Sequence, residues 1–437
     1  MPPVTKSSNV GNKKNKMSKG NGKTSRDLYG VLASLGYNGQ IPKDSIGRYR
    51  PVYEVRKRKE ANGIKPHKEV DLTSEAAKKA ISENYTVTYY SEKGFGSVVE
   101  YKKDQKTDLF QIGRSTELLI DYIVVDTIPG PKDDIDQHLT QSTISRFACR
   151  IAVERSTHQA KIFAAGFDNN RRIFLGESAP QWANGKKYSD GLTTNGILVN
   201  HPKGQWGSEM SPGVWREVSV SGEMFGLRFS RSARHRGKTT DCSNYLRDGS
   251  MIDLCGVVLI WRTPEGLANA PKVEDLEAKR DLLNTLKAQC PVGLVTLKFS
   301  NSKNPNQSSP YVYTNCGHVH GYHVWGARPS IAYTKEKKFN DKRMCPFCKE
   351  SGLFVALKFG MEPAFYIDNG PATHCFVPCG HMTTEATVKY WASALLPHGK
   401  DQFRTACPFC AIPLEGQGYI KLVFQTEADE PAEEILI

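Results

Sequence analysis

Two short motifs occur twice, in the same order, in the last third of this chain. The tripeptide Cys-Gly-His stands at residues 316–318 and again at 379–381, and Cys-Pro-Phe-Cys follows each copy, at 345–348 and at 407–410. Between the His and the next Cys lie 26 residues in the first copy and 25 in the second. Thiolate and neutral imidazole are the ligands that tetrahedral zinc prefers, so the pattern predicts two structural zinc ions.

The predicted ligands are Cys316, His318, Cys345 and Cys348 for one ion, and Cys379, His381, Cys407 and Cys410 for the other. We prefer this sequential pairing to an interleaved one because it gives both sites three cysteines and one histidine. Four protein ligands close a site, which indicates a structural metal rather than a catalytic one. Five nearby residues keep roles that the sequence leaves open: His320, His323, His374, Cys375 and Cys290.

The cysteine content agrees with metal binding. Eleven cysteines is an odd number, and the polar, basic N-terminus lacks the apolar segment of a secretory leader. We therefore expect a reducing compartment, the cytoplasm, where thiols serve as ligands rather than in disulfides. No apolar run approaches the ~20 residues that a membrane-spanning helix needs, so we expect no membrane span.

The net charge of +13 is concentrated near the N-terminus, where residues 1–68 hold 16 Lys or Arg and 4 Asp or Glu. Such an arm could contact nucleic acid or an anionic membrane surface through counterion release. A solvated tail is the simpler interpretation, because neither C-terminal motif carries interleaved basic and aromatic residues. We therefore do not expect nucleic acid as a partner.

Composition divides the chain into five parts. Residues 1–27 are predicted to be a disordered basic tail. Residues 28–270 contain short β-branched and aromatic runs separated by turn residues, which predict an all-β sandwich. A helical connector at 271–289, a small zinc-stabilised α+β region at 290–425 and an acidic tail at 426–437 follow.

Apolar spacing also locates individual elements. Strands are predicted at 110–114, 118–126, 145–154, 161–167, 225–230 and 251–262, and helices at 74–83, 272–289 and 383–396. The last helix has an apolar stripe that includes Val388 and Trp391, with a threonine as its cap. Long polar insertions at 129–142, 174–191 and 201–213 predict functional loops or an appendage.

Four segments of the predicted sandwich, taken in order, resemble a forkhead-associated (FHA) domain. They are Gly113-Arg114-Ser115, Ser145-Arg146, Thr194-Asn195-Gly196 and LRDGSMIDL at 246–254. The resemblance implies a β sandwich that binds phosphothreonine on its loops, here through Arg114, Ser115, Ser145, Arg146, Thr194 and Asn195. The chemistry is consistent, since guanidinium and hydroxyl groups donate to phosphate and an amide can hold a peptide backbone. The alternative is that these residues only cap strands and turns.

Two departures from the FHA pattern stand out. The family usually has a histidine three residues after the serine at 145, where this chain has Ala148. The segments are also far apart in sequence, which implies a sandwich with an added lobe.

The C-G-H and C-P-x-C motifs resemble the RING class of ubiquitin ligases. In that class a central helix and neighbouring loops form a groove for a ubiquitin-conjugating enzyme, which places this surface near Trp391 and Pro408. The opening Cys-x-x-Cys of a cross-braced RING is absent, because Gly293 stands where a cysteine would follow Cys290.

The whole combination is similar to one family, Pellino, from about residue 28 to residue 425. Segments that carry the similarity are FQIGRSTE, QSTISRFACRI, AAGFD, DGLTTNG, GVVLIWRT and NCGHVHGYH. The resemblance implies a RING-type ubiquitin ligase of Toll and interleukin-1 receptor signalling in innate immunity, with phosphorylated receptor-associated kinases as partners. It implies no catalytic residue, only scaffolding of a conjugating enzyme charged with ubiquitin. The first alternative is a non-enzymatic phospho-dependent signalling adaptor, and the second is a zinc-dependent nucleic-acid-binding protein.

Overall fold

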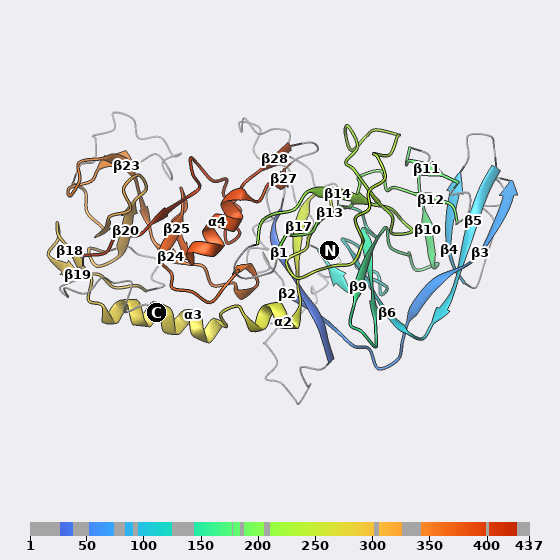
Figure 1. Cartoon of the computed structure of the whole chain (residues 1–437), viewed down its shortest axis with the longest axis horizontal. Coiled ribbons are helices and arrows are strands. Elements are labelled where there is room, and N and C mark those ends of the chain that lie inside the picture. Colours follow the sequence, from blue (N-terminus) through green and yellow to red (C-terminus); the bar gives the residue numbers. More distant parts are fainter. Residues whose placement is uncertain are drawn as a thin grey trace, which may run out of the picture.

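The computed structural model describes residues 27–37, 52–73, 84–90, 95–124, 144–176, 178–183, 188–204, 210–300, 306–325, 342–398 and 402–425. The helix predicted at 74–83, the insertion at 129–142 and both predicted tails up to residue 26 and from residue 426 lie outside these ranges. In Figure 1 the N-terminal domain and the C-terminal region lie side by side, and helices α2 (Pro264–Ala268) and α3 (Val273–Thr285) run along the lower edge.

Two sheets form the sandwich of the N-terminal domain. The larger has the strand order β15-β14-β13-β16-β17-β1-β2, and the smaller has the order β7-β6-β8-β9. The strands of the larger sheet are β1 (Leu28–Tyr37), β2 (Val52–Arg56), β13 (Leu198–Asn200), β14 (Trp215–Val218), β15 (Met224–Phe225), β16 (Met251–Asp253) and β17 (Val257–Arg262). Those of the smaller are β6 (Thr107–Gly113), β7 (Tyr122–Ile123), β8 (Cys149–Glu154) and β9 (Ala160–Ala164). Ile112 and Ile151 from one sheet share a core with Ile252 and Leu259 from the other, which confirms the predicted sandwich.

A third sheet forms the added lobe, at the right of Figure 1, with the strand order β10-β4-β5-β3. Its strands are β3 (Gly63–Thr73), β4 (Tyr85–Tyr90), β5 (Phe95–Asp104) and β10 (Arg172–Phe174). Three of the four precede β6, so the lobe is built mainly before Arg114, and the chain between Ser145 and Thr194 supplies only one of its strands, β10. Val87, Val99 and Tyr101 join the sandwich core, which explains why the lobe packs there. The insertion at 174–191 also supplies the ribbon of β11 (Gln181–Trp182) and β12 (Asp190–Gly191).

The strand predicted at 225–230 ends early, because β15 stops at Phe225. The alternating pattern continues with its faces reversed: Leu227 and Phe229 are exposed and Arg228 is buried. Residues 226–230 therefore leave the sheet as a loop. The strand predicted at 118–126 is likewise short in its described part, residues 118–124, where Tyr122–Ile123 pairs with β6.

Both faces of β17 are covered, and all six of its residues are buried. Leu259 and Trp261 point into the sandwich core, whereas Val258 and Ile260 pack with Phe365 of the C-terminal region. A strand buried on both faces has a continuous apolar sequence rather than an alternating one. The C-terminal region therefore lies on the outer face of the larger sheet.

The C-terminal region contains two similar units in succession. The first is the sheet β21-β20-β23-β22 and the second is β24-β26-β25-β29. The first comprises β20 (Pro310–Tyr313), β21 (Val319–Gly321), β22 (Lys342–Met344) and β23 (Ser351–Ala356). The second comprises β24 (Lys358–Phe359), β25 (His374–Phe376), β26 (His381–Thr383) and β29 (Tyr419–Lys421).

Shorter elements complete this region. They are β18 (Gln289–Cys290), β19 (Val295–Thr296), β27 (Leu396–His398), β28 (Gln402–Arg404) and α4 (Glu385–Ser393). Thr384 caps α4, because its hydroxyl accepts a hydrogen bond from the Thr387 amide at 3.2 Å. None of the helices in the described ranges is long and apolar enough to cross a membrane.

Candidate functional site

The structure brings together each predicted set of metal ligands, and it groups them sequentially. Within each set the ligand atoms all lie within 4.8 Å of one another; the sets are Cys316, His318, Cys345 and Cys348, and Cys379, His381, Cys407 and Cys410. In the second set His381 Nδ1 lies 3.4 Å from Cys379 Sγ and 3.7 Å from Cys407 Sγ. Three thiols and one imidazole at this spacing fit a tetrahedral zinc ion.

The backbone of the two Cys-Gly-His turns is the same in both copies. Gly317 and Gly380 have φ of 77° and 72°, in the left-handed region that glycine tolerates. A Cβ at these positions would lie 2.1 Å from the Lys421 carbonyl oxygen and 2.3 Å from that of Ala356. The repeated glycine therefore meets two constraints at once, the turn and the close approach of a neighbouring strand.

The Cys-Pro-Phe-Cys turns match as well. The residues that follow them, Lys349 and Ala411, both have positive φ, and their amides donate to the carbonyl oxygens of Cys345 and Cys407 at 2.9 and 2.8 Å. Each turn thus folds back on its first cysteine and presents both thiols on one side. The two copies therefore have the same backbone conformation as well as the same types of ligand.

The residues that could have competed as ligands lie outside the two sets. His320 is fully buried, with Nε2 3.8 Å from Cys345 Sγ, so it packs against the first set. His374 Nδ1 lies 2.9 Å from the Thr373 hydroxyl. Cys290 and Cys375 are buried in an apolar core. His323 lies against Phe354, with ring centroids 4.8 Å apart.

The two metal sets have different surroundings. Cys379 and Cys407 belong to the core that the C-terminal region shares with the sandwich, whereas Cys345 lies in a small cluster with Tyr313 and Phe354. The phenylalanines of the two Cys-Pro-Phe-Cys turns differ in the same way. Phe347 is 62% exposed, and Phe409 packs against the core of the second set.

The side chains predicted to form the conjugating-enzyme surface are buried. Trp391 has no exposed area, and its indole nitrogen donates to the Phe365 carbonyl oxygen at 2.8 Å. Pro408 is buried as well. The apolar stripe of α4 faces the core shared with the sandwich, so Trp391 and Pro408 are core side chains, and a conjugating-enzyme surface near them stays a prediction.

Four of the predicted phosphothreonine-binding residues lie where β6 ends and β8 approaches. The Arg114 amide donates to the Ser145 carbonyl oxygen at 3.2 Å, and the Ser115 amide donates to that of Arg146 at 3.1 Å. Arg114 is exposed, and its Nε donates to the Ile144 carbonyl oxygen at 2.7 Å. Arg146 forms an ion pair with Glu117 on the surface.

Thr194 and Asn195 lie on a separate loop at the same end of the sandwich. Cys149, the first residue of β8, pairs with Ala164, whose amide donates to the Ser219 carbonyl oxygen at 3.0 Å. The preceding residue, Val218, donates to the Ile197 carbonyl oxygen at 3.0 Å. These contacts link the start of β8 to the start of β13, and each start follows one of the two groups of predicted residues.

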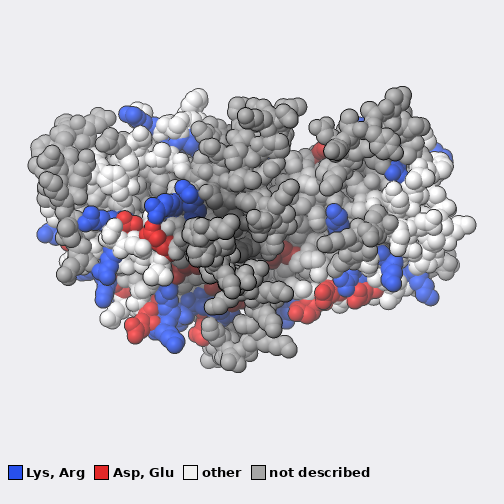
Figure 2. All heavy atoms as spheres, turned by 180° about the vertical axis from the view of Figure 1, so that it is seen from behind, with Lys and Arg blue, Asp and Glu red and all other residues white. Residues whose placement is uncertain are grey.

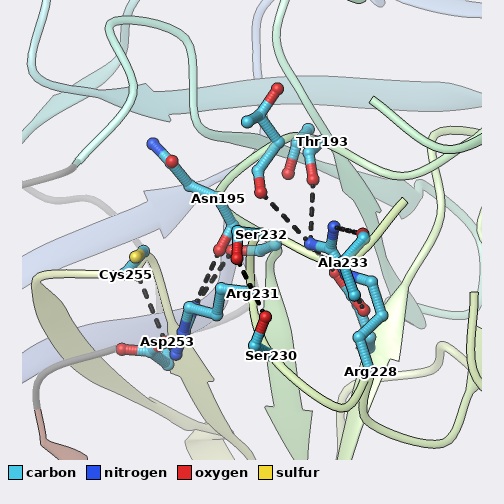
Figure 3. Close-up of polar contacts among 12 residues, drawn as sticks. Thr193, Asn195, Arg228, Ser230, Arg231, Ser232, Ala233, Asp253 and Cys255 are labelled. Atoms are coloured by element: carbon cyan, nitrogen blue, oxygen red, sulfur yellow. Dashed lines mark hydrogen bonds and ion pairs between the residues drawn. The ribbon is translucent and has the colours of Figure 1, made fainter. Parts of the chain in front are cut away.

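Two residues that the sequence analysis missed hold this second loop. Arg228 and Arg231 donate to main-chain carbonyl oxygens of residues 193–196, as Figure 3 shows. No sequence signal identifies Arg228, because it stands at the polar position of the alternating run at 225–230, and only the reversal of faces in the structure buries it. Burial raises the pKa of its carboxylate partner Glu217, and Arg228 acts against that shift. Burial disfavours the charge of Arg231, but Asp253 outweighs this and raises the pKa of Arg231.

Charges of both signs share the surface. On the face drawn in Figure 2, basic and acidic side chains of the described residues are interspersed along the lower half. Among the described residues, this face therefore offers no continuous basic surface for a nucleic-acid backbone.

Comparison with known proteins gives a two-domain division. A family model described as Pellino, FHA domain, matches residues 20–279, and one described as Pellino, RING domain, matches residues 283–429. Together they account for both the sandwich with its lobe and the region of two metal sets.

Curated relatives are similar over most of the chain. The human E3 ubiquitin-protein ligase pellino homolog 2 is 47% identical over 409 residues, which cover 92% of this chain and 96% of the relative. Protein pellino of Drosophila melanogaster is 48% identical over 409 residues, with 92% and 94% covered. The human E3 ubiquitin-protein ligase pellino homolog 3 is 44% identical over 412 residues, with 92% and 86% covered. The chain belongs to the Pellino family of E3 ubiquitin-protein ligases.

Proposed function

We propose that this ligase works by holding two proteins at once. The FHA domain binds a protein phosphorylated on threonine, and the RING domain recruits a ubiquitin-conjugating enzyme that carries ubiquitin as a thioester. Transfer to a lysine of the bound protein then follows from proximity and orientation. From the family resemblance, the phosphoproteins are receptor-associated kinases of Toll and interleukin-1 receptor signalling, met in the cytoplasm.

The observation that supports the phosphothreonine assignment is that the two loop groups precede strand starts, those of β8 and β13, which main-chain contacts link at the same end of the sandwich. Arg114, Ser115, Ser145 and Arg146 come from one group, and Thr194 and Asn195 come from the other. Arg114 supplies a guanidinium on the exposed side, where it can make charge-assisted hydrogen bonds to a phosphate. Thr194, in the other group, is exposed as well.

The RING domain contributes shape rather than a reacting group. Each metal set has four protein ligands, so a zinc ion in it would have no open position for substrate. Zinc bound there would hold together strands that have little apolar core of their own, as the small cluster around Cys345 illustrates. Cys290 and Cys375, the thiols nearest these sets, are buried, which argues against a covalent ubiquitin intermediate on either.

An assembly assay tests the ligase mechanism. The purified chain is mixed with activating enzyme, ubiquitin, ATP and a panel of conjugating enzymes, and polyubiquitin is followed by immunoblot. We expect chains with at least one conjugating enzyme and none after the metal is removed by a chelator. If zinc is bound at about two ions per chain and no conjugating enzyme supports chains, the protein functions instead as a phospho-dependent adaptor.

Arg114→Ala tests the phosphate assignment. One or two charge-assisted hydrogen bonds of ~1.5–3 kcal/mol each would be lost, so a phosphothreonine peptide should bind at least tenfold more weakly by calorimetry. Arg56→Ala is the matched control, because Arg56 pairs with Glu54 on the edge strand β2, which three strands of the larger sheet separate from β13. Unchanged peptide affinity in a folded Arg114→Ala chain would reject the assignment.

A further inference from the structure

A loop segment that is not part of the predicted phosphothreonine site contacts the main chain of that site. Residues 226–239 follow β15, and Arg228 of this segment uses its guanidinium in two directions. Nε and Nη2 donate to the two carboxylate oxygens of Glu217 at 3.0 and 2.8 Å. Nη2 also donates to the carbonyl oxygens of Thr193 and Thr194 at 3.1 and 3.3 Å.

Arg231 continues the same contact along the loop. Its Nη1 donates to the carbonyl oxygens of Asn195 and Gly196 at 3.0 and 3.4 Å. Its Nη2 pairs with the Asp253 carboxylate. Two arginines therefore hold four consecutive carbonyl groups, from residue 193 to residue 196 (Figure 3).

The carboxylates that anchor the arginines lie in the sheet. Glu217 is in β14 and Asp253 is in β16, the two strands that flank β13, into which the loop leads. The side chains of the Arg228–Glu217 pair are each 2% exposed, and Asp253 is fully buried. Both ion pairs are largely buried and the Arg228–Glu217 pair is bidentate, which fixes its geometry, so the loop is tied to the strands on both sides of β13.

The loop is also shaped to fit the arginines. Gly196 has φ of 72°, and a Cβ at this position would lie 2.5 Å from Glu217 Oε1 and 3.1 Å from Arg228 Nη2. Its amide donates to the Thr193 carbonyl oxygen at 3.1 Å, which closes the turn. With the carbonyl groups held on one side, the side chain of Asn195 points away from the arginines in Figure 3, and Thr194 is exposed.

We infer that Arg228 and Arg231 are positioning residues of the phosphothreonine site. They fix the main chain of residues 193–196, so that Thr194 and Asn195 already have their binding orientation before a peptide arrives. Because folding already orders this loop, the conformational entropy cost of ordering it does not weaken peptide binding. The inference rests on the proposed phosphothreonine function and adds how the site is organised.

Two variants and one control test the inference. Arg231→Gln removes one arginine, and the double variant Glu217→Gln with Arg228→Gln removes the other while leaving no unpaired buried charge. Arg236→Gln is the control, since Arg236 lies in the same segment but over the rings of Trp182 and Phe225, at 4.5 and 5.0 Å. The probe is a phosphothreonine peptide selected from a degenerate library on the unaltered chain, with its unphosphorylated form as blank.

Two measurements are made on the full chain: peptide affinity by calorimetry and amide hydrogen exchange. We expect both test variants to bind the peptide at least tenfold more weakly and to exchange the Gly196 amide faster, while β8 keeps its protection. The control should match the unaltered chain in both.

Three results would overturn the inference. The first is unaltered peptide affinity in folded test variants. The second is a loss of protection in β8 as large as that at Gly196, which would assign the arginines to folding alone. The third is an unaltered chain with no phosphate-dependent binding of any library peptide, which would remove the proposed function together with the inference. The first two leave the proposed function standing.

Discussion

The indole nitrogen of Trp215 donates a hydrogen bond to the carbonyl oxygen of Leu395 at 2.6 Å, and so joins the FHA domain to the RING domain. Arg262 makes a second connection, since its Nη1 donates to the carbonyl oxygens of Ala364 and Tyr366 at 2.7 and 3.1 Å. Apolar side chains of both domains surround these bonds. The FHA domain and the RING domain therefore pack against each other as one unit, as the proposed scaffold that holds two proteins requires.

Trp215→Phe should lower the stability of the whole chain while leaving each domain folded. The change keeps an apolar ring but removes the donor of this partly buried hydrogen bond to the Leu395 carbonyl oxygen, which costs ~0.5–1.5 kcal/mol. The melting temperature measured by calorimetry should fall by several degrees. Val214→Ala is the control, because the neighbouring Val214 is 53% exposed. Equal melting of the Trp215→Phe chain and the unaltered chain would show that this bond does not stabilise the domain contact.

Removing a ligand from one metal set should destabilise both domains, whereas removing a ligand from the other should not affect the FHA domain. Cys407→Ala removes a ligand from the set that lies in the core shared with the FHA domain, so it should lower the melting temperature of both domains. Cys345→Ala affects the separate cluster around Tyr313 and should leave the FHA transition unchanged. Bound zinc, measured by mass spectrometry, should fall from about two ions per chain to about one in each variant. Full zinc content after either change would contradict the ligand assignment.

A pH effect is expected from Asp190. Burial raises the pKa of this carboxyl group, although hydrogen bonds from Ser219, Ser221 and Gly191 act in the opposite direction. Between an unfolded pKa of about 4 and the raised folded value, the folded chain holds the extra proton. The unfolding free energy of the unaltered chain should therefore fall as the pH rises through this window.

Asp190→Asn has no proton to lose, so its stability relative to the unaltered chain should increase from about pH 4 and then level off. Urea unfolding of both chains at several pH values, followed at the FHA domain, measures this difference. Metal loss at acid pH affects both chains equally and cancels. Parallel stability curves would show that Asp190 titrates normally in the folded protein.

The local chemistry of the fold could be predicted, and its long-range packing could not. Ligand spacing identified both metal sets, because a ligand set depends on residue type and on turns a few residues long. The apolar run of β17 indicated a buried strand, but nothing in it showed that Val258 and Ile260 would meet Phe365, about 100 residues later. The lobe was expected from insertions after Arg114, since the strands of residues 63–104 carry no mark that separates them from the sandwich.

The site shows the same limit. Arg114 and Thr194 lie in recognisable motifs, whereas Arg228 and Arg231 act on carbonyl oxygens, which every residue has and no sequence pattern reveals. The burial of Trp391 could not be predicted for a related reason. An apolar stripe on a helix looks the same whether it binds another protein or packs on a neighbouring domain, and here the neighbouring domain occupies it.

Trp391→Ala should therefore act through stability. Removing a fully buried tryptophan from the shared core costs ~3–5 kcal/mol, so the RING domain should melt well below the unaltered chain and ubiquitin assembly should fall in parallel. The control is Lys389→Ala on the outer face of α4, where Lys389 and its partner Glu385 are both exposed, and this change should leave the melting temperature unaltered. A Trp391→Ala chain that melts like the unaltered chain but assembles no ubiquitin would instead show that the indole contacts the conjugating enzyme.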